Sequence, residues 1–400
     1  LDPVAGDELL GLLRRLNEEW GVTVILAEHR LERCLGAADR VVALERGRIT
    51  FSGPPAEFCG WAAAQDPAVA TSATRVLHEV APELAGAAIT VKQARAALEQ
   101  RGLLRDASPG SATLSRAALP AASDAGLPRP LETPGAPARR RLARRATRGV
   151  PPAGTAVRAT GVWRELGSGQ TLLRGIDLSL APGEAVALMG RNGAGKTTLL
   201  RLLAGLDRPD RGRVEAAGRV ALLLQRSSDH LLHERVGDEL PDGVTAASIG
   251  LGDDPAILDR HPRDLSGGQG QLLAAAVVAG ASAPAVLCLD EPTRGLDRLH
   301  RAELAAELQR RRAEGTATLV ATHDPEFAAT VADRVILLGQ GAVLADGPAA
   351  EILEGGWYFA TELARILQTP GVVTPSQASA LLARRAQLLD AAQNPQEPQS

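Results

Sequence analysis

Aromatic residues and lysines are the scarcest components of this 400-residue sequence. Phe, Trp and Tyr make up 2% of it, so we predict a core built from Leu, Val, Ala and Ile. Lys92 and Lys196 are the only lysines among 44 basic residues. A lysine in such an arginine-rich chain is a candidate for lysine-specific chemistry. The formal net charge of −3 argues against a strongly basic nucleic-acid binder at the level of the whole chain.

Cysteines and long apolar runs are also rare. The three cysteines, Cys34, Cys59 and Cys288, form no CxxC pair and no even disulfide framework, which favours a reducing compartment. Residues 272–289 are the most apolar run, but glycine, serine and proline interrupt it, so we do not predict a membrane span. The length and a hydrophobic fraction of 45% predict two or three globular domains.

The beginning of the chain recurs near its end. Residues 1–54 match residues 296–348, and from His29 onward the offset stays at 294, which aligns His29 with His323. A weaker echo joins residues 90–94 to residues 374–378. The residues from Val157 to Gly295 have no counterpart in the first copy. We therefore expect a tandem repeat whose first copy lacks its N-terminal portion.

Composition and the repeat together predict six segments. They are the C-terminal part of a first copy at 1–60, its helical appendage at 61–106, a Pro/Ala/Arg-rich linker at 107–154, a complete second copy at 155–355, a second appendage at 356–390 and a disordered tail at 391–400. The arginines between positions 139 and 148 of the linker suit contact with anionic lipid or RNA, although an ordinary solvated linker is favoured.

A glycine-rich loop follows a predicted buried strand at residues 184–189. Residues 190–197, GRNGAGKT, match the pattern GxxxxGK[ST] and precede a predicted helix. Such glycines let backbone N–H groups converge on phosphate oxygens, and the helix N-terminus adds its positive dipole end. Lys196 can reach the β- and γ-phosphates, and the Thr197 hydroxyl can ligate Mg²⁺. An ordinary glycine-rich turn before a helix is much less favoured. The predicted nucleotide ligands are Gly190, Asn192, Gly193, Gly195, Lys196, Thr197 and Thr198.

An acidic pair ends a second predicted buried strand, at residues 285–289. Asp290 and Glu291 stand at its carboxyl end, where ligands gather in parallel α/β sheets. Asp290 can hold Mg²⁺, and Glu291 can deprotonate an attacking water. Alone, such a pair would be a helix cap. Its position 94 residues after Lys196 favours the catalytic interpretation.

The pentapeptide LSGGQ at residues 265–269 precedes a predicted apolar helix over residues 272–279. Ser266 and the two following glycines can form a second anion-binding nest at the start of that helix. Without its neighbours, the same pentapeptide is equally well explained as a helix cap.

These motifs together resemble the ATPase subunit of an ABC transporter, over residues 157–353 and, as a domain tail, over residues 1–58. The resemblance implies an α/β P-loop NTPase fold with a mixed sheet flanked by helices, a small helical subdomain and a C-terminal helical appendage, preceded by part of a second such domain. It also implies ATP hydrolysis, with ATP and Mg²⁺ as cofactors.

The resemblance assigns roles residue by residue. Glu291 is the catalytic base, His323 the switch histidine and Gln225 the Q-loop glutamine. In the first copy, Asp2 belongs to the D-loop and His29 is the switch histidine. The signature residues Ser266, Gly267, Gly268 and Gln269 and the D-loop Asp297 contact nucleotide, and Thr197, Gln225 and Asp290 hold Mg²⁺.

The segment after Gln225 is similar to the ATPases of energy-coupling factor (ECF) transporters, with Asp229, Val236 and Glu239 at the corresponding places. This similarity implies a peripheral ATPase on the cytoplasmic face of the cell membrane that energises import of a vitamin, a vitamin precursor or a metal ion. Its partners would be ECF-type transmembrane and substrate-binding components. The alternative is a soluble tandem ABC ATPase that acts on ribosomes or nucleic acid, but no nucleic-acid partner is expected.

Three positions depart from the family pattern. Leu166 occupies the place of the aromatic residue that stacks on adenine, Leu272 replaces an arginine after the signature, and Ser227 replaces a proline in the Q-loop. His230 and His233 have a spacing that suits a metal on a helix, but no third ligand is evident and a polar surface role is favoured.

The first copy contains neither the phosphate-binding loop nor the signature. ABC ATPases hydrolyse ATP between two domains, so the resemblance implies an ATPase-domain partner, either a second chain in trans or the missing N-terminal half. An inert fragment is a third interpretation.

Overall fold

The computed structural model describes residues 3–28, 30–45, 47–104, 152–280, 283–355 and 359–393. Asp2 and His29 lie outside these residues, as do the arginines between 139 and 148, most of the expected linker and the tail from residue 394. Among the described residues, no helix combines the length and the apolar character that crossing a bilayer requires.

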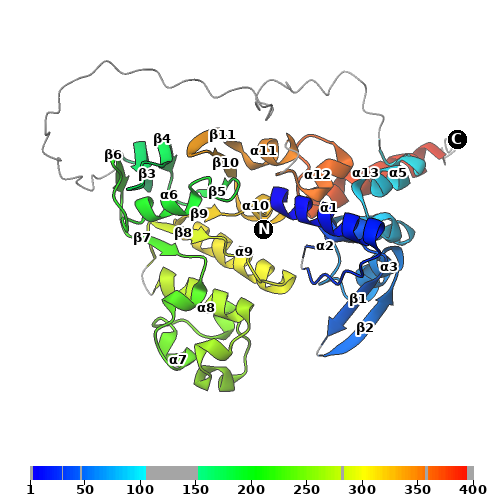
Figure 1. Ribbon diagram of the computed structural model, residues 1–400, viewed down its shortest axis with the longest axis horizontal. Helices are drawn as coiled ribbons and strands as arrows, with labels where there is room; N and C mark the ends of the chain where they lie inside the picture. Colours follow the sequence, from blue (N-terminus) through cyan, green and yellow to red (C-terminus); the bar gives the residue numbers. More distant parts are fainter. Residues whose placement is uncertain are drawn as a thin grey trace, which may run out of the picture. The chain divides into compact units, whose positions relative to one another are not determined.

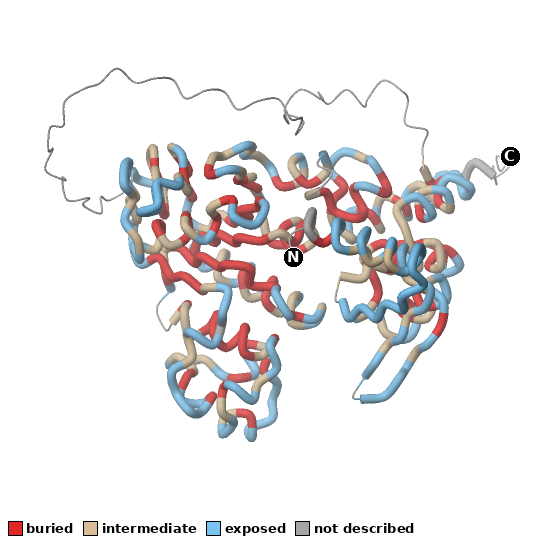
Figure 2. Tube along the Cα trace, in the orientation of Figure 1, coloured by how far each residue is buried: buried red, intermediate tan, exposed pale blue. Residues whose placement is uncertain are grey.

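A six-stranded sheet in the order β11-β10-β5-β9-β8-β7 organises the part that follows residue 152 (Figure 1). Its strands are β5 (Ala185–Met189), β7 (Val220–Leu223), β8 (Val286–Asp290), β9 (Ala317–Ala321), β10 (Arg334–Gly339) and β11 (Ala342–Pro348). Only β11 runs antiparallel to its neighbour. Every residue of β5, β7, β8 and β9 is buried (Figure 2), which explains why these strands are continuous apolar runs in the sequence.

The two faces of this sheet pack against different layers. One face contacts α6 (Lys196–Leu203) and an antiparallel sheet of β4 (Thr171–Leu180), β3 (Val157–Glu165) and β6 (Arg211–Ala216). The other contacts α8 (Gly267–Ala279), α9 (Arg298–Ala313) and α10 (Pro325–Val331). Along β8, Cys288 joins the first layer and Leu287 and Leu289 the second, because successive strand residues point to opposite faces.

The chain between β7 and β8 forms a small helical subdomain with its own core. It consists of η3 (Ser227–His230), α7 (Val236–Glu239), η4 (Ala247–Ile249), η5 (Pro255–Asp259), η6 (Pro262–Asp264) and α8. Val236, Ile249 and Ile257 pack on Leu273 of α8, while Leu272 of the same helix packs toward the sheet. The helix is apolar on nearly all sides because both layers cover it.

Helices dominate both ends of the chain. The N-terminal part contains α1 (Pro3–Trp20), α2 (Leu31–Cys34), η1 (Leu35–Ala37), the hairpin β1 (Val41–Glu45) and β2 (Arg48–Gly53), α3 (Pro55–Gln65), α4 (Ser72–Val80), η2 (Pro82–Ala87) and α5 (Val91–Gln100). The C-terminal part contains α11 (Ala349–Gly355), α12 (Glu362–Leu367) and α13 (Pro375–Gln393).

The hairpin β1–β2 repeats β10–β11 in detail. Every cross-strand pair of β1–β2, such as Val41–Gly53, has an equivalent 294 residues later, such as Val335–Gly347. Both ladders also shift register after the equivalent third pair. The sequence repeat is therefore a structural repeat.

The repeat does not extend to the burial of equivalent residues. Ile25 is 94% exposed and lies in a segment, residues 21–28, without regular secondary structure. Its equivalent 294 residues later, Leu319, is fully buried in β9 between β5 and β8. The apolar run before position 29 thus lacks, among the described residues, the neighbours that bury its counterpart.

The terminal helices of the two copies pack crosswise. α4 contacts α13, and α5 contacts α12. Leu77 and Leu98 of the first copy share one core with Leu363 and Leu382 of the second. Because α4 and α5 precede α12 and α13 by more than 250 residues, this core joins the two repeats directly.

Candidate functional site

The phosphate-binding loop, residues 190–197, is packed so closely that only glycine fits at two positions. Gly190 has φ 155°, and a Cβ there would meet the Leu338 carbonyl oxygen at 2.2 Å. Gly195 has φ 103°, and a Cβ there would lie 3.0 Å from the Leu172 carbonyl oxygen. The loop therefore folds tightly between β10 and β4, which leaves its backbone N–H groups able to face an anion.

Lys196 opens α6 and lies over this loop. Its Nζ donates to the carbonyl oxygens of Gly190 at 2.7 Å and Arg191 at 3.3 Å. It is also 3.9 Å from Glu291 Oε1. The ammonium group thus lies between the loop and the acidic pair. There it can neutralise the charge of a phosphate that the backbone N–H groups of the loop bind.

Thr197 and Asp290 meet at the end of β8. The Thr197 hydroxyl donates to Asp290 Oδ2 at 2.6 Å. Burial raises the pKa of Asp290, although the hydrogen bond from Thr197 and the charge of Lys196 oppose that rise. A hydroxyl and a carboxylate oxygen side by side form a donor set that suits Mg²⁺, and beside the loop they fit Mg²⁺ on a nucleotide.

Glu291 adopts a left-handed backbone conformation, with φ 51°. Its N–H donates to the Ala321 carbonyl oxygen, and its Oε2 lies 2.7 Å from Nδ1 of His323, which follows β9. A non-glycine residue in this conformation is strained, and such residues concentrate at functional sites. The predicted base and the predicted switch histidine are therefore brought together.

The signature residues form a separate group at the start of α8. Ser266 and Gln269 make a reciprocal capping box, with Ser266 Oγ accepting from Gln269 N and Gln269 Oε1 accepting from Ser266 N. A Cβ at Gly268 would approach the His300 ring at 3.0 Å, so the glycine permits close packing on α9. Asp297 caps α9 and contacts His300 Nδ1 at 2.7 Å.

Gln225 and the two predicted surface histidines lie beyond β7. Gln225 is exposed and lies two residues after β7, which pairs in parallel with β8. His230 Nε2 accepts from Leu224 N at 3.0 Å, and burial lowers its pKa. His233 contacts Glu239 instead. The histidines thus have structural partners, and no metal-ligating cluster occurs among the residues that the structure describes.

Comparison with known proteins identifies the family. The ABC transporter family model matches residues 173–294. An ABC transporter ATP-binding protein of Streptomyces coelicolor is 38% identical, over 94% of this chain and 69% of the relative. The chain belongs to the ABC transporter ATP-binding proteins. A second such protein, of Streptomyces avermitilis, is also 38% identical, over 96% of this chain and 70% of the relative. The chain thus spans about 70% of the length of these two relatives.

Among solved structures, cbiO1 of Clostridium perfringens, described as part of the ABC transporter complex cbiONQ, is 24% identical, with a TM-score of 0.44 over 50% of this chain and 92% of its own. The predicted fold class, a P-loop ABC ATPase with a mixed sheet flanked by helices, is confirmed by the family match and the sheet described above. As a member of this family, the chain is an ATP-hydrolysing subunit.

The departures from the family pattern have visible consequences in this ABC ATPase. Leu166 is 42% exposed in the turn between β3 and β4. Trp163 is engaged by Arg211, whose guanidinium carbon lies 5.8 Å from the ring centroid. Leu272 is buried in the core, and Nε2 of the neighbouring buried Gln271 has no hydrogen-bond partner among the described residues.

Arg301 is a residue that the sequence motifs do not single out. Its Nη1 donates to Asp324 Oδ2 at 2.9 Å, and its Nε donates to the Leu296 carbonyl oxygen at 3.1 Å. It therefore links the D-loop to the residue after His323. The only signal in the sequence is its place four residues after Asp297, which is one turn of a helix.

Proposed function

We propose that this ABC ATPase hydrolyses ATP with the residues gathered at the carboxyl ends of β5, β8 and β9. The observation that carries the proposal is the joint placement of Lys196, the Thr197–Asp290 pair and the Glu291–His323 pair around one loop. In this assignment the loop N–H groups and Lys196 bind the phosphates. Glu291 takes a proton from the attacking water, and His323 orients Glu291 and contacts the γ-phosphate.

Thr197, Asp290 and Gln225 are proposed to hold Mg²⁺, which when bound supplies positive charge next to the β- and γ-phosphates. Ser266, Gly267, Gly268, Gln269 and Asp297 are proposed to contact the nucleotide of an opposing ATPase domain. The capping box and the packing on His300 support this role, because they fix the N-terminal turn of α8 with its dipole end available to phosphate.

We propose that residues 3–104 are the C-terminal part of a first ABC ATPase domain with its helical appendage. The shared hairpin register and the crosswise helix contacts support this assignment. The exposure of Ile25 supports it too, because the equivalent Leu319 is covered by strands that the described residues 3–104 do not contain. A polypeptide with the equivalents of β5 and β8 would cover this segment.

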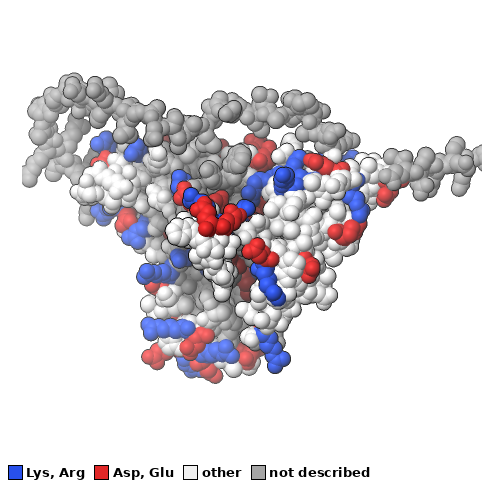
Figure 3. All heavy atoms as spheres, turned by 45° about the vertical axis from the view of Figure 1, so that its right-hand side comes forward, with Lys and Arg blue, Asp and Glu red and all other residues white. Residues whose placement is uncertain are grey.

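The transport role is proposed to be that of an ECF-type importer for a vitamin, a vitamin precursor or a metal ion. The sequence after Gln225 and the helical appendages support it. The helical subdomain would contact the transmembrane component at the cytoplasmic face, and Leu232, 85% exposed in this segment, supplies an apolar contact point. On the face drawn in Figure 3, basic and acidic side chains are intermingled, so it offers no support for the nucleic-acid alternative.

A direct test is purification of the tagged chain from its native membrane, followed by identification of the proteins retained. The proposal predicts small, very hydrophobic transport components, and weaker retention by Leu232→Asp with the basal rate of ATP hydrolysis unchanged. Retention of ribosomes or RNA, with no membrane protein, would overturn the ECF assignment.

A further inference from the structure

The two repeat copies carry different charges at the positions where they meet. Directly after the two aligned histidine positions, the first copy has Arg30 and the second has Asp324, 294 residues later. A second difference lies at the starts of α4 and α12, each of which follows an Ala-Thr pair. Thr71 caps α4 and Thr361 caps α12 in the same way, by accepting a hydrogen bond from the backbone N–H three residues later. The next residue is Ser72 in the first copy and Glu362 in the second.

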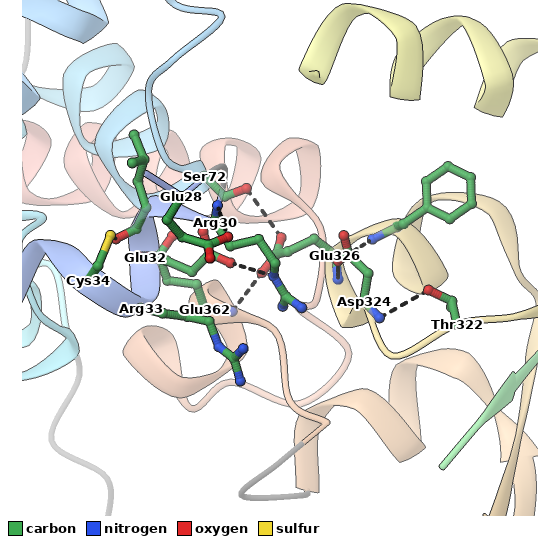
Figure 4. Close-up of polar contacts among 12 residues, drawn as sticks. Glu28, Arg30, Glu32, Arg33, Cys34, Ser72, Thr322, Asp324, Glu326 and Glu362 are labelled. Atoms are coloured by element: carbon green, nitrogen blue, oxygen red, sulfur yellow. Dashed lines mark hydrogen bonds and ion pairs between the residues drawn. The ribbon is translucent and has the colours of Figure 1, made fainter. Parts of the chain in front are cut away.

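Arg30 reaches from the first copy toward the acidic residues of the second (Figure 4). Its side chain is 14% exposed, and its Nε donates to Glu32 at 3.2 Å. Burial lowers the pKa of Arg30, but attraction from Asp324, Glu32 and Glu326 outweighs this effect and raises it. Its Nη1 is buried and has no hydrogen-bond partner among the described residues. The guanidinium thus lies in an acidic environment to which both copies contribute carboxyl groups.

Glu326 and Glu362 form the second part of this contact. Glu326 accepts from the Ser72 hydroxyl at 3.2 Å and from Glu362 N at 2.7 Å. Glu362 accepts from Ala73 N, at the start of α4, at 2.9 Å. Glu362 is buried and Glu326 is half-buried, and each accepts a hydrogen bond from a donor of the first copy. Ser72, as the equivalent of Glu362, is the residue that makes this arrangement possible.

We propose that these charge differences make the two copies pair with each other within one chain and prevent the complete copy from pairing with a second complete copy in the same way. This inference rests on the proposed tandem of ATPase domains. It specifies the partner surface: the complete copy accepts a copy with a cation at the Arg30 position and a neutral hydroxyl at the Ser72 position.

A pair of two complete copies would lose both features. Asp324 would face a second Asp324 in place of Arg30, and Glu326 would face the Glu362 carboxyl in place of the Ser72 hydroxyl. Arg301 lies 2.9 Å from Asp324 within its own copy and weakens the repulsion between two Asp324 carboxylates, but it does not restore the attraction that Arg30 supplies. A carboxylate in place of the Arg30 cation beside Asp324 opposes association at a buried interface, which disfavours the symmetric pair.

Cysteine crosslinking in the full chain tests the proposal. Glu79 on α4 and Ser379 on α13 are hydrogen bonded across the two copies, so Glu79→Cys with Ser379→Cys reports the unlike contact. We expect a crosslink within one chain, without a rise in mass. Arg30→Glu should lower the crosslinking rate at least about tenfold, while the size-matched Arg30→Gln lowers it less than about threefold and Arg30→Lys leaves it near the parent rate.

A second variant separates repulsion across the interface from repulsion inside the first copy. Arg30→Glu combined with Glu32→Gln removes the new neighbouring carboxylate pair but keeps the charge that faces Asp324. Its crosslinking rate should stay at least about fivefold below that of the parent chain. Rates equal to that of Arg30→Gln, or a predominant crosslink between two chains, would overturn the proposal.

Nucleotide binding in the same samples keeps the two proposals apart. Lys196→Ala should abolish binding of a fluorescent ATP analogue and leave the crosslinking pattern unchanged. If the parent chain itself does not bind the ATP analogue, the result would count against the catalytic assignment alone. Equal crosslinking by Arg30→Glu and Arg30→Gln would count against the pairing proposal alone.

Discussion

His323 Nδ1 lies 2.7 Å from Glu291 Oε2, and the two residues follow neighbouring parallel strands. Glu291 makes this contact from a left-handed backbone conformation, and its N–H donates to Ala321 at the end of β9. The sheet thus positions both side chains from its most buried strands, which lets a carboxylate keep a fixed orientation beside Lys196.

The Thr197–Asp290 contact predicts a change in metal dependence. Thr197→Ala removes one of the two oxygen groups proposed to hold Mg²⁺, so the Mg²⁺ concentration for half-maximal ATP hydrolysis should rise about tenfold or more. Thr197→Ser keeps the hydroxyl and should stay within about threefold of the parent value. An unchanged Mg²⁺ dependence of Thr197→Ala, measured by phosphate release, would remove Thr197 from the metal site.

Ser266 has two roles that substitutions can separate. Ser266→Ala breaks the capping box and should cost about 1 kcal/mol, which corresponds to about 2–4 °C in Tm for a domain of this size. Ser266→Asn keeps a good cap and should retain Tm. Both should lower ATP hydrolysis if the hydroxyl contacts nucleotide. Full activity of Ser266→Asn would leave Ser266 with the capping role alone.

The buried carboxyl groups between the copies predict a pH-dependent stability. Burial raises the pKa of Glu326 to about 7 and that of Glu362 to about 8. Because the folded state holds these protons more tightly than the unfolded chain, the stabilisation is complete below the ordinary carboxyl pKa and is lost as pH rises through these values. Tm should fall by several degrees between about pH 6 and about pH 9. Glu362→Gln should flatten this fall, and the exposed Glu351→Gln should not. Identical slopes for both variants would contradict the assignment.

Equivalent apolar positions in the two copies should respond differently to truncation. Leu319→Ala in β9 removes a fully buried side chain and should cost about 2–5 kcal/mol. Ile25→Ala, 294 residues earlier, removes an exposed side chain and should cost less than about 0.5 kcal/mol. Urea unfolding measures both. A cost above about 2 kcal/mol for Ile25→Ala would mean that this segment is covered in solution.

The catalytic strands and the loop could be predicted from the sequence because their requirements are local. A buried strand needs a continuous apolar run, and this phosphate loop needs glycine at Gly190, where a Cβ would collide with backbone, and at Gly195, where φ is 103°. The predicted strands at residues 184–189 and 285–289 therefore agree with β5 and β8 within one residue at each end.

The contacts between distant segments could not be predicted in this way. Nothing local marks Arg301 as the partner of Asp324, or Arg30 as a residue that faces the second copy, since each contact depends on how separate helices pack. The left-handed conformation of Glu291 could not be predicted from the sequence either, because the hydrogen bond that its N–H makes is to Ala321 of the neighbouring strand β9. The roles of individual residues within the site remain proposals that substitutions must test.

The most direct test of the account is the Glu291→Gln variant, assayed for ATP hydrolysis and ATP binding side by side. The substitution keeps the size of the side chain and removes the proton acceptor beside His323. We predict a loss of hydrolysis of about 10²–10⁴-fold with ATP affinity preserved. Hydrolysis at the parent rate would show that Glu291 is not the base and would contradict the mechanism at its centre.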